Sequence, residues 1–155
     1  MTRDDADAFM AASHKTLPAA PEWKSGNRIG ERRASLTIAV NGRLSDFSIM
    51  LIVRLVDSAY LIALILAGDR CISRLCMGAG HFDRATLTFC SEPHFHAWSA
   101  NRPKGPALPK ELRNYVVLPR EAWSRDGGFA WFLEQNGIES PAWMPPQWPE
   151  NQGFV

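Results

Sequence analysis

This chain of 155 residues has few cysteines, few histidines and almost no net charge. It contains 3 cysteines and 4 histidines, and its formal net charge at pH 7 is +1. A charge so close to zero creates no global field that would select nucleic acid or a membrane surface. Cys71, Cys76 and Cys90 are odd in number and lie inside apolar segments. This argues against a disulfide framework and predicts reduced, buried thiols in a cytoplasmic protein.

The chain also lacks an uninterrupted apolar run that would suit a membrane helix. The nearest candidate is FSIMLIVRLVDSAYLIALILAG, residues 47–68, but Arg54 and Asp57 fall near its middle. Each charge would cost about 2.5–3.5 kcal/mol at the centre of a bilayer. The two halves are rich in Ile, Val and Leu, with a polar VDSA between them, which predicts two buried strands joined by a short turn. The acidic N-terminal stretch MTRDDADAFM is not expected to be a signal peptide.

Charge and proline are unevenly distributed along the chain. Residues 28–125 carry 14 basic and eight acidic groups, a net of +6, whereas residues 126–155 carry four acidic groups and no basic one. A basic body with an acidic tail indicates an anionic partner, or a tail that folds back on the body. We expect a single α+β domain over residues 1–140, followed by a Pro/Trp-rich tail over residues 141–155.

Several apolar segments predict β-strands with no helices between them. Four strands are expected at residues 33–40, from 43 or 47 to 56, 59–67 and 70–77. Residues 86–90 and 94–98 are expected to form one long strand or two short ones, and 115–119 is a candidate for a further short strand. Asn41-Gly42 is a strong signal for a hairpin turn. One helix is expected over residues 4–17 and another over residues 120–137, ending at Gly137. The expected fold is therefore α+β: a curved antiparallel meander of five to six strands with N- and C-terminal helices.

Two of the histidines, His94 and His96, lie one residue apart in EPHFHAWSANR, residues 92–102. Side chains alternate along a strand, so both imidazoles would share one face while Phe95 occupies the other. We expect Phe95 in the core and both imidazoles toward solvent or a cleft. His81, at the end of a glycine-rich loop, would join them if a hairpin brings it alongside.

Three interpretations of these histidines stay open. The first is that they are exposed strand residues with no chemistry. In the second, His81, His94 and His96 are catalytic acids and bases acting on RNA phosphate, because imidazole titrates near neutral pH. The substrate-binding residues would then be Arg74, Arg84, Trp98, Asn101 and Arg102, with the guanidinium groups stabilising charge and the indole stacking on a base. The third is a metal site, which is the weakest because no cysteine or carboxylate lies at a matching ligand spacing, so no metal or cofactor is expected.

Five short motifs resemble those of a set of small uncharacterised bacterial and prophage proteins. The matching segments are residues 5–10, DFSIMLIVR at 46–54, SRLCMGAGH at 73–81, PHFH at 93–96 and FLEQNGI at 132–138. The resemblance spans most of the chain and implies a fold and a candidate site, but no chemistry. One departure is that AWSANR, which follows His96, lacks the carboxylate that the pattern often places there.

Whether the protein is an enzyme stays open at this point. One hypothesis is a small cytoplasmic, histidine-dependent ribonuclease-like toxin of a mobile-element or defence-linked locus. The alternative is a non-enzymatic protein-binding module, such as an inhibitor, anti-defence or antitoxin-like protein, using the aromatic tail with Trp143, Trp148 and Phe154. A third hypothesis is a homodimer that associates through the second and third predicted strands. The expected partner is thus RNA or a protein, and not a membrane.

Overall fold

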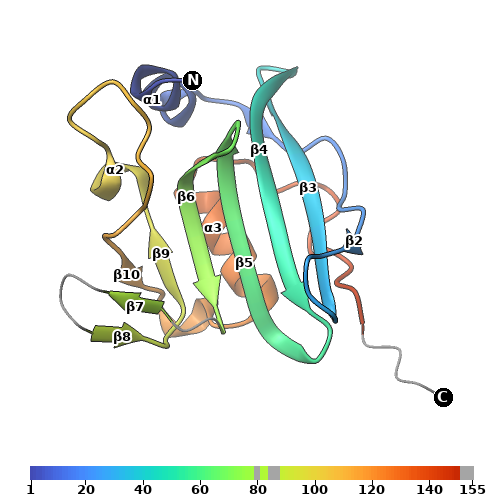
Figure 1. The fold of residues 1–155 in the computed structure, drawn as a ribbon. Coiled ribbons are helices and arrows are strands. Elements are labelled where there is room, and N and C mark those ends of the chain that lie inside the picture. The colour runs from blue at the N-terminus through green and yellow to red at the C-terminus, as the bar shows by residue number, and fades with distance from the viewer. Residues whose placement is uncertain (79–80, 84–87, 151–155) are drawn as a thin grey trace.

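An open, eight-stranded antiparallel sheet dominates the fold (Figure 1). The computed structural model describes residues 1–78, 81–83 and 88–150, and only the backbone of 81–83 and 88–90. The sheet strands are β1 (Lys15–Thr16), β2 (Lys24–Ser25), β3 (Glu31–Val40), β4 (Arg43–Arg54), β5 (Asp57–Ala67), β6 (Arg70–Met77), β9 (His94–His96) and β10 (Val116–Val117). The other elements are β7 (His81–Asp83), β8 (Thr88–Cys90), α1 (Arg3–Ala11), α2 (Trp98–Asn101), η1 (Arg120–Ala122) and α3 (Arg125–Gln135). The expected α+β class is confirmed.

Strands β3 to β6 form the predicted meander. The first hairpin turns at Asn41 and Gly42, which have φ angles of 51° and 78° between the paired residues Val40 and Arg43. Positive φ at both central residues is the geometry that the right-handed strand twist favours in a two-residue turn. Within residues 47–68, β4 runs to Arg54, a turn follows at 55–56, and β5 runs from Asp57 to Ala67, so the prediction of two strands joined by a short turn is confirmed. Within the described ranges, no helix is long and apolar enough to cross a membrane.

The order of the strands departs from a simple meander after β6. The sheet order is β1-β3-β4-β5-β6-β9-β10, with β2 beside β3, while β7 and β8 form a separate ladder. The sheet therefore has eight strands where five to six were expected. Two of the additional strands, β1 and β2, contain only two residues each, too few to produce a recognisable alternation.

One face of the sheet is packed into the main core. In Figure 1, α3 lies behind β5 and β6 and covers this face. Core side chains include Leu36, Ile49, Leu51, Leu61, Ile65, Phe129 and Phe132. Phe95 of β9 joins them, 4% exposed, with its ring centroid 5.1 Å from Trp131 and 5.9 Å from Phe132. The prediction that Phe95 turns into the core is confirmed.

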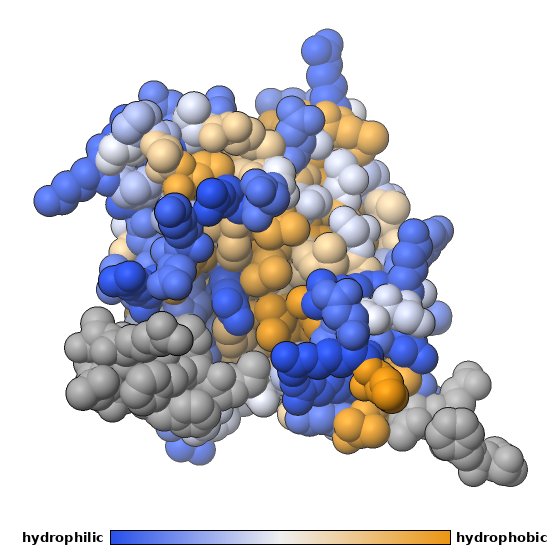
Figure 2. Space-filling view, in the orientation of Figure 1, coloured by the Kyte–Doolittle hydropathy of each residue, from blue (hydrophilic) through white to orange (hydrophobic). Residues whose placement is uncertain are grey.

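The opposite face of the sheet is not covered by any of the described helices, and we call it the open face. Figure 2 shows apolar side chains along the middle of this face between hydrophilic margins. The strand register makes one row across it from Arg33, Ile52, Ile62, Cys76, His94 and Val117. The next row contains Ser35, Met50, Leu64, Arg74 and His96. Directly opposed side chains in an antiparallel ladder lie about 4.5–5.5 Å apart at Cβ, so each row is a line of contacts.

Both helices are shorter than the sequence predicts. The N-terminal helix ends at Ala11, because Ala12 is extended and the chain enters β1 at Lys15. The C-terminal segment divides into η1 and α3, since Ser124 caps a new helix by accepting a hydrogen bond from Gly127 N at 2.9 Å. Gly137 has a φ of 64°, which confirms the predicted helix end.

The described part of the tail folds back on the body. Trp143 Nε1 donates to Leu17 O at 3.3 Å, and Trp23 Nε1 donates to Gln147 O at 3.0 Å. Trp148 Nε1 donates to the Asp126 carboxylate at the start of α3. Residues 141–150 are thus part of the packed molecule, and Phe154 lies outside the described residues.

Candidate site at Cys76, His94 and His96

The pairing of β9 with β6 brings a cysteine against two histidines. In this ladder Cys76 is opposite His94, and Arg74 is opposite His96. Because side chains alternate, Cys76, His94 and His96 project from the same open face while Phe95 projects into the core. The predicted alternation in β9 is therefore confirmed.

The three side chains meet closely. Cys76 Sγ and one ring nitrogen from each histidine all lie within 4.8 Å of one another. The two imidazole rings are 5.1 Å apart between centroids, with an interplanar angle of 73°. Tyr115, just before β10, lies 5.0 Å from the His94 ring and 5.6 Å from the His96 ring.

The site is enclosed. His94 and His96 are both 0% exposed, and Cys76 is 1% exposed. The expectation that both imidazoles face solvent or a cleft is wrong, since an outward position on β9 is covered here. Local alternation fixes which side of a strand a residue occupies, but not what other parts of the chain cover it.

Two polar contacts orient the cluster. His94 Nδ1 lies 2.8 Å from Glu92 O, and a carbonyl only accepts, so Nδ1 carries a proton; in the neutral imidazole Nε2 is then the lone-pair atom. Arg74 Nε donates to Cys76 Sγ at 3.0 Å. A cationic donor to sulfur stabilises the thiolate, the form that attacks electrophiles and binds metals.

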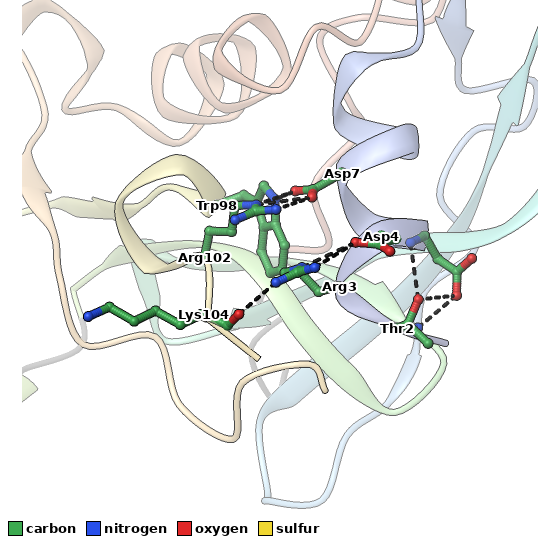
Figure 3. A network of polar contacts seen from close by, with 8 residues as sticks. Thr2, Arg3, Asp4, Asp7, Trp98, Arg102 and Lys104 are labelled. Atoms are coloured by element: carbon green, nitrogen blue, oxygen red, sulfur yellow. Dashed lines mark hydrogen bonds and ion pairs between the residues drawn. The ribbon is translucent and has the colours of Figure 1, made fainter. Parts of the chain in front are cut away.

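Most of the expected substrate-binding residues have structural partners in the chain itself. Trp98 is 5% exposed, and its Nε1 donates to Asp7 Oδ1 at 2.9 Å. Arg102 forms a bidentate pair with the same Asp7 carboxylate, with Nη2 to Oδ2 at 2.7 Å (Figure 3). Asn101 Nδ2 donates to Asn114 O at 2.9 Å, and Asn101 Oδ1 accepts from Asn114 N at 2.8 Å.

The Asp7 carboxylate is the electrostatic centre of that second group. Its hydrogen bonds from Arg102 and then from Trp98 lower the pKa of Asp7 from 3.8 to about 2. The positive charge of Arg102 is thereby paired with the Asp7 carboxylate, and these contacts connect α1 to α2. This network positions α2, and the expected role of Arg102 in binding phosphate stays a prediction.

Two predicted residues fall where no side chain is described. His81 belongs to β7, where its Cα partner is Cys90 of β8, but its side chain is outside the described part. Arg84 lies outside the described residues altogether. Their proposed roles stay predictions.

Sequence reasoning missed Cys76 and Tyr115. Cys76 lies 18 positions before His94 and was expected only to be a reduced, buried thiol. The argument against a metal, that no cysteine lies at a matching ligand spacing, is wrong. The β6–β9 register places Cys76 directly opposite His94 although the two are far apart in the sequence. Alternation in both strands was the available signal, but their pairing was not evident from local sequence.

No family model, curated protein or solved structure matches this chain. The resemblance to small bacterial and prophage proteins therefore stays a prediction, and the function must be argued from the chain's own geometry.

Proposed function

We propose that this protein is a non-enzymatic protein-binding module whose partner docks at one end of the sheet. The observation that carries the proposal is the exposure of two β-branched side chains in adjacent loops. Ile29, before β3, is 108% exposed, and Val56, in the β4–β5 turn, is 80% exposed. Single exposed apolar residues are common, but neighbouring ones at loop tips are typical of interaction sites.

The two loops are held together by backbone contacts. Leu55 N donates to Gly30 O at 2.8 Å, which sets the residues after Ile29 against those before Val56. Arg125, at the start of α3, secures the turn by donating to Asp57 O at 2.8 Å and Tyr60 O at 3.2 Å. A rigid apolar tip loses little conformational freedom on binding, which favours its use as an anchor.

An open cleft of about 750 Å³ adjoins this tip. It is lined by Leu55 and Ser58 from the turn, by Arg125, and by residues 146–150 of the tail. Trp148 and two prolines make one wall, so the cleft suits an apolar side chain of a protein partner. An inhibitor or antitoxin-like protein would act in this way, by covering a surface of its target.

The burial of the histidines favours binding over the ribonuclease alternative. A general acid or base must come within hydrogen-bond reach of the proton that it transfers. His94 and His96 are 0% exposed, so a phosphate would meet them only after the cover over the site had moved. The proposals of a ribonuclease and of a homodimer through β4 and β5 remain alternatives with their own tests.

The experiment uses two variants of the full chain. Tagged wild-type protein is incubated with host extract, the recovered proteins are identified, and the leading partner is purified and titrated. Burying one such side chain contributes about 1.5–3 kcal/mol. Replacing two of them, in Ile29→Asp/Val56→Asp, should therefore weaken binding at least tenfold.

Leu44→Asp is the matched control. Leu44 is 71% exposed and lies at the other end of β4, so its replacement should leave the affinity unchanged. Equal binding by the double variant and the wild type would exclude the proposed surface. Cleavage of RNA by wild-type protein, lost in a folded His96→Ala variant, would support the ribonuclease, and a sedimenting dimer would support self-association.

A further inference from the structure

We propose that Cys76, His94 and His96 bind one zinc ion that fastens β9 to β6. The three side chains come from two strands whose pairing is non-local, yet their ligand atoms all lie within 4.8 Å of one another. The proposal is independent of the docking surface, since Ile29 and Val56 take no part in it.

The kinds of donor atom favour zinc. One thiolate and two neutral imidazoles are the sulfur and nitrogen ligands that zinc takes, whereas magnesium and calcium require oxygen. Zinc bonds of about 2.0–2.3 Å in tetrahedral geometry place ligand atoms roughly 3.3–3.7 Å apart. Rotations of side chains that already share one face would bring the three atoms to that spacing. A fourth ligand would complete the coordination.

The contacts around the cluster are those that a metal site needs. Metal-bound histidines usually donate their second ring N–H to a carbonyl or carboxylate, which orients the ring. The contact of His94 Nδ1 with Glu92 O, at 2.8 Å, meets this requirement, with Nε2 as the ligand atom. The contact of Arg74 Nε with Cys76 Sγ, at 3.0 Å, supports the thiolate. Binding of zinc would release the thiol proton to solvent.

Burial and topology indicate what the ion does. All three side chains are at most 1% exposed, so a bound ion would be enclosed by protein, as in structural zinc sites. The β6–β9 ladder has only three residue pairs, and β9 in turn carries the two-residue edge strand β10. A metal bond between β6 and β9 would reinforce a short stretch of backbone pairing at this end of the sheet.

The test is a metal titration of the full-length protein, stripped with a chelator under reducing conditions. Cobalt(II) is added first, because its visible bands report tetrahedral geometry and its near-ultraviolet bands report thiolate ligation. We expect one cobalt per chain, both sets of bands, and their loss when zinc is added. Wild-type protein that binds no cobalt, or that shows neither set of bands, would overturn the proposal.

Two variants identify the ligands. His94→Asn keeps an N–H donor for Glu92 O but removes the Nε2 ligand, and Cys76→Ser removes the sulfur. Loss of an outer contact alone weakens metal binding about 10–100-fold, so loss of a ligand should weaken it at least about 100-fold. The charge-transfer band per bound cobalt should also fall in Cys76→Ser. Wild-type affinity and spectra in both variants would exclude this site.

Cys71→Ser is the matched control. The Cys71 thiol donates to Ser73 O at 3.2 Å, and burial raises the pKa of Cys71 to about 11, so it stays protonated. This variant should retain the wild-type cobalt spectrum. If either ligand variant fails to fold by circular dichroism, the zinc-loaded wild type decides the question. A chelator should then lower its Tm, and an unchanged Tm would count against the proposal.

Discussion

Lys15 is a charged residue with no access to solvent. It is 0% exposed, and its Nζ donates to Phe9 O at 3.1 Å and Met10 O at 3.0 Å. These carbonyls belong to the last turn of α1, where the helix leaves acceptors without intrahelical donors. Nζ also lies 4.9 Å from the centre of the Phe9 ring. Lys15 thus closes the end of α1 from the neighbouring strand β1.

Replacing Lys15 by methionine should destabilise the protein although it removes a buried charge. The variant keeps most of the side-chain volume but removes the Lys15 donor from Met10 O and leaves Phe9 O with only the Ala12 N–H, at 3.2 Å. A buried polar group that loses its partner costs about 1–3 kcal/mol, and we expect the free energy of unfolding to fall by that amount. Denaturant titration measures it. Lys24→Met, at an exposed position in β2, should change it by no more than about 0.5 kcal/mol.

The residues around Phe95 show what local sequence predicts well and what it does not. Alternation around Phe95 correctly assigned its ring to the core and the two imidazoles to the other face. It did not reveal that those imidazoles are enclosed, because Tyr115 comes from a segment almost 20 positions away. Burial of a strand residue depends on every element packed over it, whereas its side of the strand depends only on its neighbours.

At the scale of elements, one carboxylate connects α1 to α2. Asp7 accepts hydrogen bonds from Trp98 and Arg102, which hold its pKa at about 2 (Figure 3). A carboxyl whose pKa is lower in the folded state adds stability at pH values above its unfolded pKa, here 3.8. That contribution declines as the pH falls through this range toward 2, where the folded protein also takes up the proton.

Asp7→Asn should therefore show a pH-dependent loss of stability. Above about pH 4, the variant should have a lower Tm than the wild type, because its amide cannot pair with the Arg102 charge. The two Tm values should converge as the pH approaches 2. Asp4→Asn is the control, since the Asp4 carboxylate pairs with its neighbour Arg3, makes no hydrogen bond to Arg102 or Trp98 in the described part of the chain, and has a side chain that is 77% exposed. A difference for Asp7→Asn that persists to pH 2 would mean that the charge is not responsible.

Elements with several turns or many alternating residues were predictable, and the shortest ones were not. Strands β3 to β6 have eight or more residues each, and their hydrophobic patterns and the Asn41-Gly42 turn located them. By contrast, β1 and β2 are two-residue strands that pair with β3, too short to show a pattern of their own. The predicted helix over residues 120–137 was too long, because the Ser124 cap begins a new helix inside it.

For the molecule as a whole, the contacts between segments that are distant in the sequence could not be predicted. The meander follows from consecutive hairpins. The Cys76–His94 pair instead depends on β9 pairing with β6 after the chain has formed the separate β7–β8 ladder. The return of the tail is similar: residues 143–148 reach Leu17, Trp23 and Asp126. The charge distribution allowed a tail that folds back on the body, but only the packed structure shows where it lies.

Trp148 is the residue through which the tail is anchored, and its replacement tests whether the tail belongs to the folded body. Its ring centre lies 5.8 Å from Trp23 and 6.0 Å from Phe129, and its Nε1 donates to Asp126. Trp148→Ala removes these contacts together. A fully buried Trp→Ala change costs about 3–5 kcal/mol, so at this half-buried position we expect about 1–3 kcal/mol. Denaturant unfolding followed by circular dichroism measures the change.

Gln147→Ala provides the matched comparison. The Gln147 side chain is exposed, and only its backbone carbonyl accepts from Trp23, so this variant should unfold like the wild type. If Trp148→Ala is equally stable, the tail adds nothing to the fold, and the cleft beside Leu55 loses a fixed wall. If it is less stable, the tail acts as a structural brace. Partner binding must then be compared at protein concentrations and temperatures where both variants are fully folded, because unfolding would otherwise imitate a loss of affinity.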